Sequence, residues 1–391
     1  MARILYAASG DGYGHATRAH AVADELIRRG HDMMFLTSHK TLRYLEPIFP
    51  RRVHDVFGLL TVYEDGAAHI RKTLLHNLRR APRRLGPSNA RVRRLFRTFR
   101  PDLLVTDFEP FSAFWARVLG VPFVSLDNQH LLTHCVLDPV PGAVWDRLNA
   151  YLTIRLYYGG AQRYLVTTFI DAPVRYHPTT LIPPILRPQL HRRTPTSGDY
   201  LLVYKGASGL HPELEETLRR LDRMEIRAYG FPRTGRQGHV TYKAIDREAF
   251  LDDLAGCAGV IATAGHSLVC ECIHLEKPML LTPIRKQYEQ MINAHYVQKL
   301  GYGRAIPRLT PEEVDRFLDE LPRYRSAMAG LRFSGAARAA DVIEAELRGS
   351  STRRTPIPPD PSQARSAPSP PAFPHTGERD ESIRLASGVG S

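Results

Sequence analysis

The chain has 391 residues, of which 43% are hydrophobic and 24% charged, a composition typical of a globular protein large enough for two domains. It carries 53 Lys and Arg against 40 Asp and Glu, which gives a formal net charge of +13. With four cysteines and no apolar run of the ~18–20 residues that cross a bilayer, the sequence excludes a disulfide-rich fold and an integral membrane protein, and it predicts a cytoplasmic location.

The N-terminal part of the chain alternates short, continuously apolar runs with amphipathic stretches of helical length. Residues 3–8 predict a first strand, residues 15–29 a helix, and residues 102–106 and 121–126 two further buried strands. Continuous apolar strands separated by helices are typical of a parallel sheet covered on both faces. We therefore expect a Rossmann-like domain over residues 1–185.

A glycine-rich loop joins the first strand to the first helix, with the sequence Ser9-Gly10-Asp11-Gly12-Tyr13-Gly14-His15. Alternate glycines let the backbone turn tightly and approach a ligand, and the helix that follows favours an anion at its N-terminus. The spacing matches neither the dinucleotide fingerprint nor a P-loop. Gly12 and Gly14 are therefore candidate binding residues for an anion or a sugar nucleotide, with a simple tight turn as the alternative.

His15, at the mouth of this loop, is a candidate general base because imidazole accepts a proton near neutral pH. Asp107 ends a strand expected beside the first one, at the carboxyl edge where open α/β sheets bind ligands. A carboxylate there would orient His15 and stabilise its protonated form. Asp107 and Glu109 also offer ligands for a metal ion, but the chain has no Asp-x-Asp pair, and we expect neither a metal nor a cofactor.

Most of the net charge lies in residues 66–101, which hold eleven Lys and Arg and no Asp or Glu. Apolar residues such as Leu74 and Leu78 accompany these cations. The segment therefore fits a solvated surface helix, a grip on an acidic acceptor, or contact with an anionic membrane. Pro82 and Pro87 predict at least two helical pieces. The arginines assigned to this acceptor or membrane patch are Arg79, Arg80, Arg83, Arg84, Arg91, Arg93 and Arg94.

Residues 186–198 are rich in Pro, Arg, Thr and Ser and predict a linker. The alternation of strands and helices then restarts and predicts a second Rossmann-like domain over residues 199–348. Two such halves imply an α/β architecture in which the domains face each other across a cleft. From residue 349 to 391 the chain is rich in Pro, Ser and Arg, which predicts a disordered tail.

The second half contains another loop of small residues, Ala264-Gly265-His266-Ser267, before a helix that carries Glu271. A helix N-terminus with a serine hydroxyl suits a phosphate, and the Glu271 carboxylate would accept hydrogen bonds from ribose. Glu289, Gln290 and Asn293 follow with a carboxylate and two amides, which suit sugar hydroxyls. The alternative for each of these polar residues is a solvated helix face.

In combination, these motifs resemble those of glycosyltransferases with the two-domain GT-B fold, near family 28 and the UDP-glycosyltransferases. The pattern Gly-x-Gly-x-Gly-His-x-x-Arg, which ends at Arg18, is similar to a poorly characterised bacterial and archaeal subgroup, as are Thr106-Asp107-Phe108-Glu109-Pro110 and Asp127-Asn128-Gln129-His130. The resemblance covers about residues 1–347. It implies a nucleotide-sugar donor, UDP-linked in most members, bound mainly by the second half.

The resemblance also implies roles for single residues. Gly265, His266 and Ser267 would meet the diphosphate, and Glu271 the ribose. Glu289, Gln290 and Asn293 would lie near the sugar, while Gly12, Gly14 and His15 would face the reaction centre. Gly206 and Ser208 occupy the place of another phosphate-side loop.

The expected reaction is an inverting, metal-independent transfer in which His15, oriented by Asp107, takes the proton of an acceptor hydroxyl. The acceptor is unknown, with a lipid-linked molecule and a peripheral position on the inner membrane face as options. One alternative is a nucleotide-sugar epimerase of the same fold, which would convert UDP-GlcNAc without an acceptor. Another is a nucleic-acid-binding protein, but only Phe96 and Phe99 interleave with the arginines, so we expect no nucleic acid partner.

Overall fold

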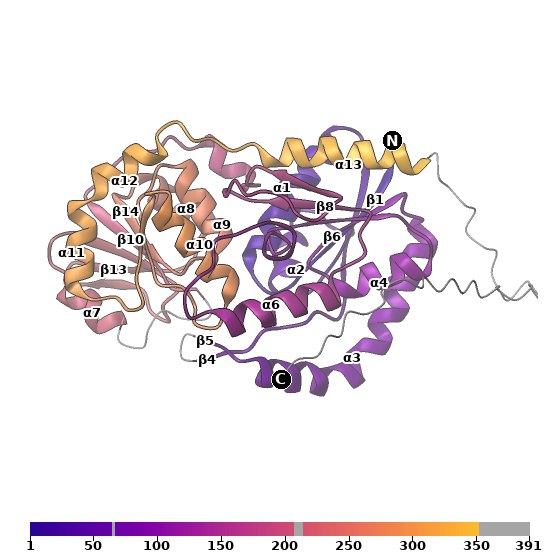
Figure 1. The fold of residues 1–391 in the computed structure, drawn as a ribbon, viewed down its shortest axis with the longest axis horizontal. Coiled ribbons are helices and arrows are strands. Elements are labelled where there is room, and N and C mark those ends of the chain that lie inside the picture. Colours follow the sequence, from indigo (N-terminus) through magenta and orange to yellow (C-terminus); the bar gives the residue numbers. More distant parts are fainter. Residues whose placement is uncertain (65–66, 207–213, 352–391) are drawn as a thin grey trace, which may run out of the picture. The chain divides into compact units, whose positions relative to one another are not determined.

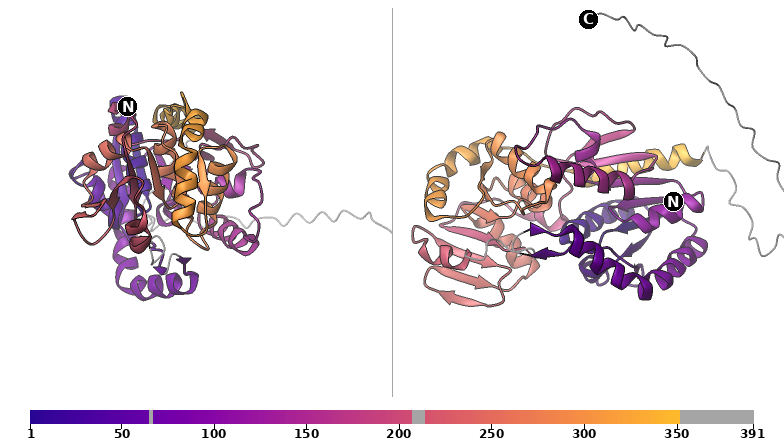
Figure 2. Two further views of the ribbon diagram at one scale, coloured as in Figure 1. Left: turned by 90° about the vertical axis from the view of Figure 1, so that its left-hand side faces the viewer. Right: turned by 60° about the horizontal axis from the view of Figure 1, so that its bottom comes forward.

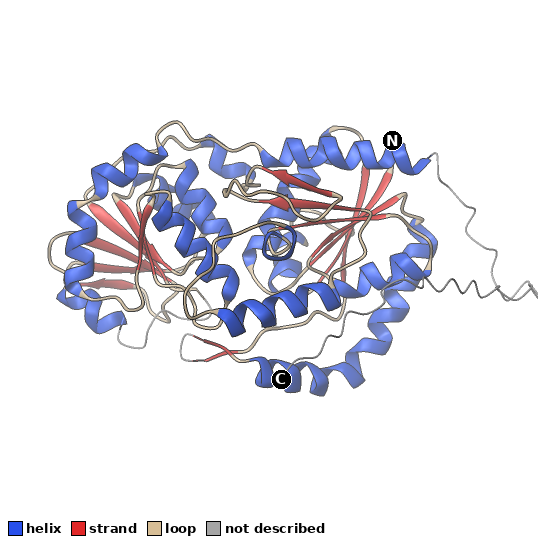
Figure 3. Cartoon of the chain, viewed as in Figure 1, coloured by secondary structure: helices blue, strands red, loops and turns tan. Residues whose placement is uncertain are grey.

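The computed structural model describes residues 1–64, 67–206 and 214–351. These residues form two seven-stranded sheets, one from each half of the sequence, and helices surround both of them (Figures 1 and 3). All neighbouring strands of the first sheet are parallel. In the second sheet only the edge strand β12 runs antiparallel to its neighbour. The prediction of an α/β fold with two Rossmann-like domains is confirmed.

The first sheet contains, in spatial order, β3 (Val53–Asp55), β2 (Asp32–Thr37), β1 (Arg3–Ala8), β6 (Leu103–Asp107), β7 (Phe123–Asp127), β8 (Arg163–Thr167) and β9 (Thr179–Ile182). Its helices are α1 (Tyr13–Arg28), α2 (His39–Leu45), α3 (Ile70–Phe99), α4 (Pro110–Val118), α5 (Leu131–His134) and α6 (Val144–Tyr157). A short antiparallel pair, β4 (Tyr63–Glu64) and β5 (Ala67–Ala68), precedes α3.

The second sheet contains, in spatial order, β12 (Gly235–Gln237), β13 (Val240–Lys243), β11 (Glu225–Tyr229), β10 (Tyr200–Tyr204), β14 (Gly259–Ala262), β15 (Met279–Leu281) and β16 (Gly303–Ala305). The helices in its part of the chain are α7 (Leu214–Arg220), α8 (Arg247–Gly256), α9 (His266–His274), α10 (Tyr288–Lys299), α11 (Pro311–Asp319) and α12 (Leu321–Met328). Helix α13, at the end of the described residues, spans Gly335–Ser351.

Both faces of the first sheet are buried, because successive residues of β1 belong to two different apolar clusters. Ile4 and Tyr6 pack with α1 and α2 on one face. Leu5 and Ala7 pack with α3 and α4 on the other face. Side chains alternate along a strand, so a continuous apolar run is what a doubly covered sheet requires.

Helix α13 corrects the predicted domain boundary at residue 348. The prediction placed this helix in the second domain, but α13 lies beside the first half of the chain (Figures 1 and 2). Its Ala339, Ala340 and Ile343 are fully buried in the core of the first sheet. Arg29 at the end of α1 bonds Asp341 and Glu344 of α13 at 2.8 and 3.0 Å. Apolar burial and ion pairing thus return the chain to the first half.

The segment predicted as a linker, residues 186–198, packs against the second half. Leu186 and Leu190 are buried in the core cluster of the second sheet, and Pro188–Arg192 forms a turn of 3₁₀ helix. Of the predicted tail, residues 349–351 continue α13, and residues 352–391 lie outside the described residues.

Helix α3 runs unbroken from Ile70 to Phe99, so the prediction that Pro82 and Pro87 divide it is wrong. A proline inside a helix removes one backbone hydrogen bond and bends the helix without necessarily ending it, and α3 follows a bent path (Figure 1). Contacts from Asn77 to Phe99 hold it in place. Asn77 and Ser88 bond the backbone of the segment that precedes the helix, and the apolar side chains of its last two turns are buried against the sheet.

Candidate active site

A cavity of about 1100 Å³ lies between the two sheets and is lined by residues of both halves. The loops that follow β1, β6 and β7 line it from the first half, and those that follow β10, β14 and β15 line it from the second. The carboxyl ends of both parallel sheets therefore face this space, which is where open α/β sheets bind ligands.

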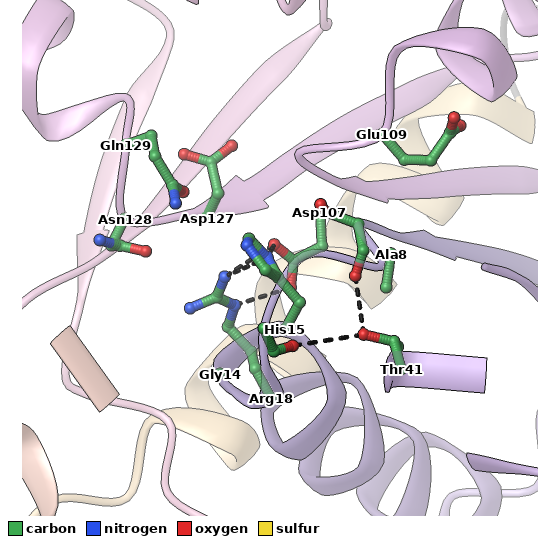
Figure 4. Close-up of polar contacts among 12 residues, drawn as sticks. Ala8, Gly14, His15, Arg18, Thr41, Asp107, Glu109, Asp127, Asn128 and Gln129 are labelled. Carbon is green, nitrogen blue, oxygen red and sulfur yellow. Dashed lines mark hydrogen bonds and ion pairs between the residues drawn. The ribbon is translucent and has the colours of Figure 1, made fainter. Parts of the chain in front are cut away.

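The structure brings His15 and Asp107 together at this cavity (Figure 4). Strand β6 lies beside β1 with Asp107 opposite Ala8, and Nδ1 of His15 lies 2.7 Å from Oδ1 of Asp107. A carboxylate can only accept, so Nδ1 carries the proton of this hydrogen bond. In a neutral imidazole, Nε2 then has a free lone pair, as a general base needs.

Arg18 completes this cluster, and sequence reasoning gave it no role. Its Nε and Nη2 donate to the two oxygens of Asp107 at 2.7 Å each, and the residue is only 3% exposed. Burial alone would raise the pKa of Asp107, but Arg18 and His15 outweigh it and hold that pKa below its usual range. The three-residue spacing of His15 and Arg18 places both on one face of α1, and this spacing is the feature of the sequence that indicates a shared site.

Glu109, in the turn after β6, is the N-cap residue of α4. Its carboxylate caps α4 by accepting from the backbone N–H of Phe111 and Ser112, and it points away from His15 (Figure 4). Phe108 adopts φ = 55°, the left-handed region, and its ring stacks on Tyr158. In the described ranges, no group of three or more His, Cys, Asp or Glu is placed to hold a metal ion. The metal-independent reaction stays a prediction.

The first glycine loop is shaped by contacts that glycine permits. Gly12 has φ = 125° and precedes α1, whose N-terminus has no side-chain cap. The hydroxyl of Thr41, on α2, donates to the carbonyl of Ser9 at 2.7 Å and fixes the backbone of the loop. A Cβ on Gly14 would lie 2.5 Å from Oγ of Ser267, so the two predicted loops meet across the cavity.

In the second loop, Gly265 is the N-cap of α9, with no side-chain cap and no acidic residue in the first turn. Gly265, His266 and Ser267 all line the cavity. Burial, together with the nearby charge of Arg18, lowers the pKa of His266 to about 3, so this imidazole is neutral. The N–H groups at this uncapped N-terminus and the Ser267 hydroxyl are suitable donors for a phosphate.

Gln290 and Asn293 hold this loop from behind. Oε1 of Gln290 accepts from the backbone N–H of Ala264 and Ile284, at 3.1 Å each, and Nδ2 of Asn293 donates to the carbonyl of Ala264 at 3.0 Å. Asn293 is 2% exposed and is absent from the cavity lining, so its predicted place beside the sugar is corrected to a place behind the loop. Gln290 still reaches the cavity wall.

Glu271 lies on the cavity wall and is paired with Arg187, a residue of the predicted linker. The guanidinium donates to both carboxylate oxygens, at 2.6 and 3.0 Å. Burial raises the pKa of Glu271, and the charge of Arg187 opposes that change. The pair spans 84 positions of sequence, and no local pattern predicts it.

Glu289 reaches across the cavity to the first half. Its oxygens accept from Asn128 at 2.9 Å and from Gln129 at 3.3 Å, the two residues that follow β7. Asp127, at the end of β7, is buried and bonds both the ring and the backbone N–H of His130, which fixes this turn. Asp127, Asn128 and Gln129 lie near the His15 cluster in Figure 4.

The remaining predicted loop is partly described. Gly206, after β10, lines the cavity, whereas Ser208 lies outside the described residues. Arg79, Arg80, Arg83, Arg84, Arg91, Arg93 and Arg94 are absent from the cavity lining and lie on α3. Within the described residues, Arg84 pairs with Asp55 at 2.6 Å, and Arg79, Arg83 and Arg94 have no ion pair.

Comparison with known proteins identifies the same architecture. The model of a family described as "Glycosyl transferase family 1" matches residues 2–322. An uncharacterised glycosyltransferase of Methanosarcina mazei is 22% identical over 356 residues, covering 80% of this chain and 87% of that protein. A UDP-N-acetylglucosamine–N-acetylmuramyl-(pentapeptide) pyrophosphoryl-undecaprenol N-acetylglucosamine transferase of Alcanivorax borkumensis is 27% identical over 325 residues, covering 78% and 85%.

A solved structure shows the same fold at low sequence identity. It is a glycosyltransferase of Phytolacca americana complexed with UDP-2-fluoro-glucose and pterostilbene, with a TM-score of 0.61 and 17% identity. The similarity covers 89% of this chain and 100% of that one. The resemblance to GT-B proteins, first drawn from short motifs, therefore extends to the architecture of both halves.

Proposed function

The chain belongs to glycosyl transferase family 1 and is a glycosyltransferase; on that premise we propose that it moves a sugar from a UDP-linked donor to an acceptor hydroxyl, with inversion and without a metal. The observation that carries the proposal is the His15–Asp107 hydrogen bond of 2.7 Å beside a cavity into which two uncapped helix N-termini open. A base on one side and anion donors on the other suit displacement of a nucleoside diphosphate.

In the proposed reaction, Nε2 of His15 takes the hydroxyl proton as the acceptor oxygen forms its bond to the anomeric carbon. The bond from that carbon to the diphosphate oxygen breaks, and the electron pair leaves with the nucleoside diphosphate. The backbone N–H groups near Gly265 and the hydroxyl of Ser267 stabilise the charge that develops there. Asp107 accepts from Nδ1 throughout and stabilises the imidazolium.

The chemistry of the second half supports a nucleotide-sugar donor. Ser267 and the N-terminus of α9 take the diphosphate, and Glu271 takes the ribose hydroxyls with the lone pairs that Arg187 leaves free. The Glu289 carboxylate accepts hydrogen bonds from sugar hydroxyls, which replace the hydrogen bonds that it now accepts from the amides of Asn128 and Gln129. The names of two similar proteins, which include UDP-N-acetylglucosamine and UDP-2-fluoro-glucose, favour a UDP sugar.

Thermal stabilisation across a panel of nucleotide sugars tests this assignment, because a ligand that binds only the folded state raises the melting temperature. We expect a UDP sugar to raise it most and Ser267→Ala to reduce that rise. Ser326→Ala, at an exposed serine outside the cavity, is the matched control. The absence of stabilisation by any nucleotide sugar would contradict the donor proposal.

We further propose that the first half receives its acceptor at an anionic lipid surface. Helix α3 exposes Leu74, Leu75 and Leu78 by 49–58%, at positions that share a face with Arg71 and Arg79. Exposed apolar and basic residues on one helix suit the interface of an anionic bilayer. The printed name of the Alcanivorax relative includes an undecaprenol-linked compound. None of the helices within the described ranges has the length and hydrophobicity to span a bilayer.

Helix α6 (Val144–Tyr157) also exposes apolar side chains. Trp145, Leu148, Leu152 and Leu156 are 43–76% exposed and recur every three to four residues, while Asp146 and Thr153, farther round the helix, line the cavity. The helix thus presents an apolar face to solvent and a polar face to the candidate active site. An acceptor held at a membrane could reach the cavity along it.

Sedimentation with phosphatidylglycerol vesicles tests this surface. We expect binding at low salt that weakens as salt rises, and that is lost in Arg79→Glu/Arg83→Glu and in Leu74→Ser/Leu78→Ser. The control is Arg219→Glu, a charge reversal at an exposed position of α7 in the second half. Equal sedimentation of all variants, or none for the wild type at low salt, would refute the membrane proposal.

A further inference from the structure

A buried arginine touches both members of the proposed catalytic pair. Besides its two bonds to Asp107, Nη2 of Arg18 lies 3.1 Å from Nδ1 of His15. Arg18 is 3% exposed and Asp107 is fully buried, so water cannot replace either partner. Oδ1 of Asp107 accepts from both His15 and Arg18, at 2.7 Å each. The three side chains therefore form one charged cluster.

The charge of Arg18 changes what Asp107 does to His15. A lone carboxylate 2.7 Å from an imidazole favours its protonated form, and a protonated histidine cannot take a proton from an acceptor. Arg18 supplies a permanent positive charge that neutralises Asp107 and stands beside the ring. The carboxylate can then orient the His15 ring while its own charge is balanced by Arg18.

Four other titratable side chains lie around this cluster, and none of them supplies the positive charge that balances Asp107. On β1, the hydroxyl of Tyr6 lies 3.5 Å from Asp107 and stays neutral, because burial raises its pKa well above the usual value. On α9, His266 is neutral. On α10, Glu289 is bonded by two amides, and its burial favours the protonated form. On β7, the carboxylate of Asp127 is bonded to His130.

We propose that Arg18 is a positioning residue that keeps His15 in its neutral, proton-accepting form and fixes the Asp107 carboxylate that orients it. The inference rests on the proposed function for the role of His15 as the base. The electrostatic part stands on the geometry of the three side chains and needs no substrate for its test.

The test follows the imidazole of His15 by NMR titration in the full-length protein, with its signal assigned as the one that is missing in His15→Gln. Arg18→Met removes the cation but keeps an unbranched side chain, and we expect the His15 midpoint to rise by about one to two pH units. Arg18→Lys keeps the cation and should stay close to the wild type. Arg28→Met, at the exposed end of α1, is the control.

Arg18→Met leaves a buried carboxylate without its arginine and can unfold the protein. The double variant Arg18→Met/Asp107→Asn removes both charges, so we expect it to fold and its His15 midpoint to be lower than that of a folded Arg18→Met. An unchanged midpoint in a folded Arg18→Met, or a double variant whose midpoint lies above the wild type, would overturn the proposal.

Activity gives a second readout once a donor and an acceptor are known. The acid limb of the kcat/KM profile of Arg18→Met should move to higher pH by the same amount as the NMR midpoint, so that activity lost at low pH returns at high pH. A purely structural role would lower the whole profile without moving the limb. If His15→Ala keeps full turnover while the NMR midpoint moves, the proposed function fails and the electrostatic coupling stands.

Discussion

At the scale of single residues, the candidate site is held by a few strong polar contacts whose partners lie far apart in sequence. The proximity of His15 and Asp107 could be predicted because His15 lies in the first turn of the helix after the first strand and Asp107 ends the neighbouring strand. The pairs Arg18–Asp107 and Arg187–Glu271 could not. They depend on side-chain packing across 89 and 84 positions of sequence, which leaves no local pattern.

Asp107→Asn tests how much the buried ion-pair cluster contributes to the free energy of unfolding. The amide keeps the size but cannot accept from both His15 and Arg18 as an anion, and it leaves Arg18 as a buried, unpaired charge. We expect the free energy of unfolding to fall by about 3–5 kcal/mol, as when one partner of a buried ion pair is removed, measured by urea denaturation. Asp32→Asn, which breaks the more exposed pair with Arg52, should cost about 0–1 kcal/mol. Equal losses in the two variants would contradict the buried cluster.

His266 gives a pH dependence of stability. Its folded pKa is lowered to about 3 by burial and then by Arg18, whereas an exposed histidine has a pKa near ~6.5. Between these values the unfolded chain binds the extra proton, so stability falls as pH falls below ~6.5, by about 2 kcal/mol at pH ~5 from this residue. His266→Gln should weaken the dependence and exposed His76→Gln should not. Identical pH profiles of the melting temperature for wild type and His266→Gln would refute this prediction.

At the scale of elements, local periodicity predicted strands and helices well, but it did not determine where they pack. Helix α13 is amphipathic by its sequence, and only the structure shows that Ile343 docks on the first sheet. In α3 the two prolines suggested a break, but contacts from Asn77 to Phe99 hold the helix together. Burial and long-range hydrogen bonds outweighed the local signal in both elements.

Ile343→Ala tests the docking of α13. Removing a buried isoleucine side chain leaves a cavity in the core of the first sheet, and we expect a loss of about 2–5 kcal/mol in the free energy of unfolding. Ile27→Ala on α1, where the side chain is 37% exposed, is the control and should lose much less. Urea denaturation followed by circular dichroism measures both, and similar small losses would show that α13 is not part of this core.

At the scale of the described chain, the two halves meet through their functional loops. Gly14 approaches Ser267, and Glu289 bonds Asn128 and Gln129 across the cavity. The sequence predicted two Rossmann-like halves, because each half contains its own alternation of strands and helices. Which residues touch across the cavity depends on how two complete domains pack, and that information is not carried by either half alone.

The most direct test of the proposed reaction is the release of nucleoside diphosphate from the preferred UDP sugar, measured for the wild type and His15→Ala with a membrane-lipid extract as the source of acceptor. General-base catalysis contributes typically ~10²–10⁴-fold, so we expect His15→Ala to be slower by about that factor while the donor stabilises both proteins equally. Equal rates of release in the two proteins would contradict the account, as would conversion of the UDP sugar to a new hexosamine without acceptor.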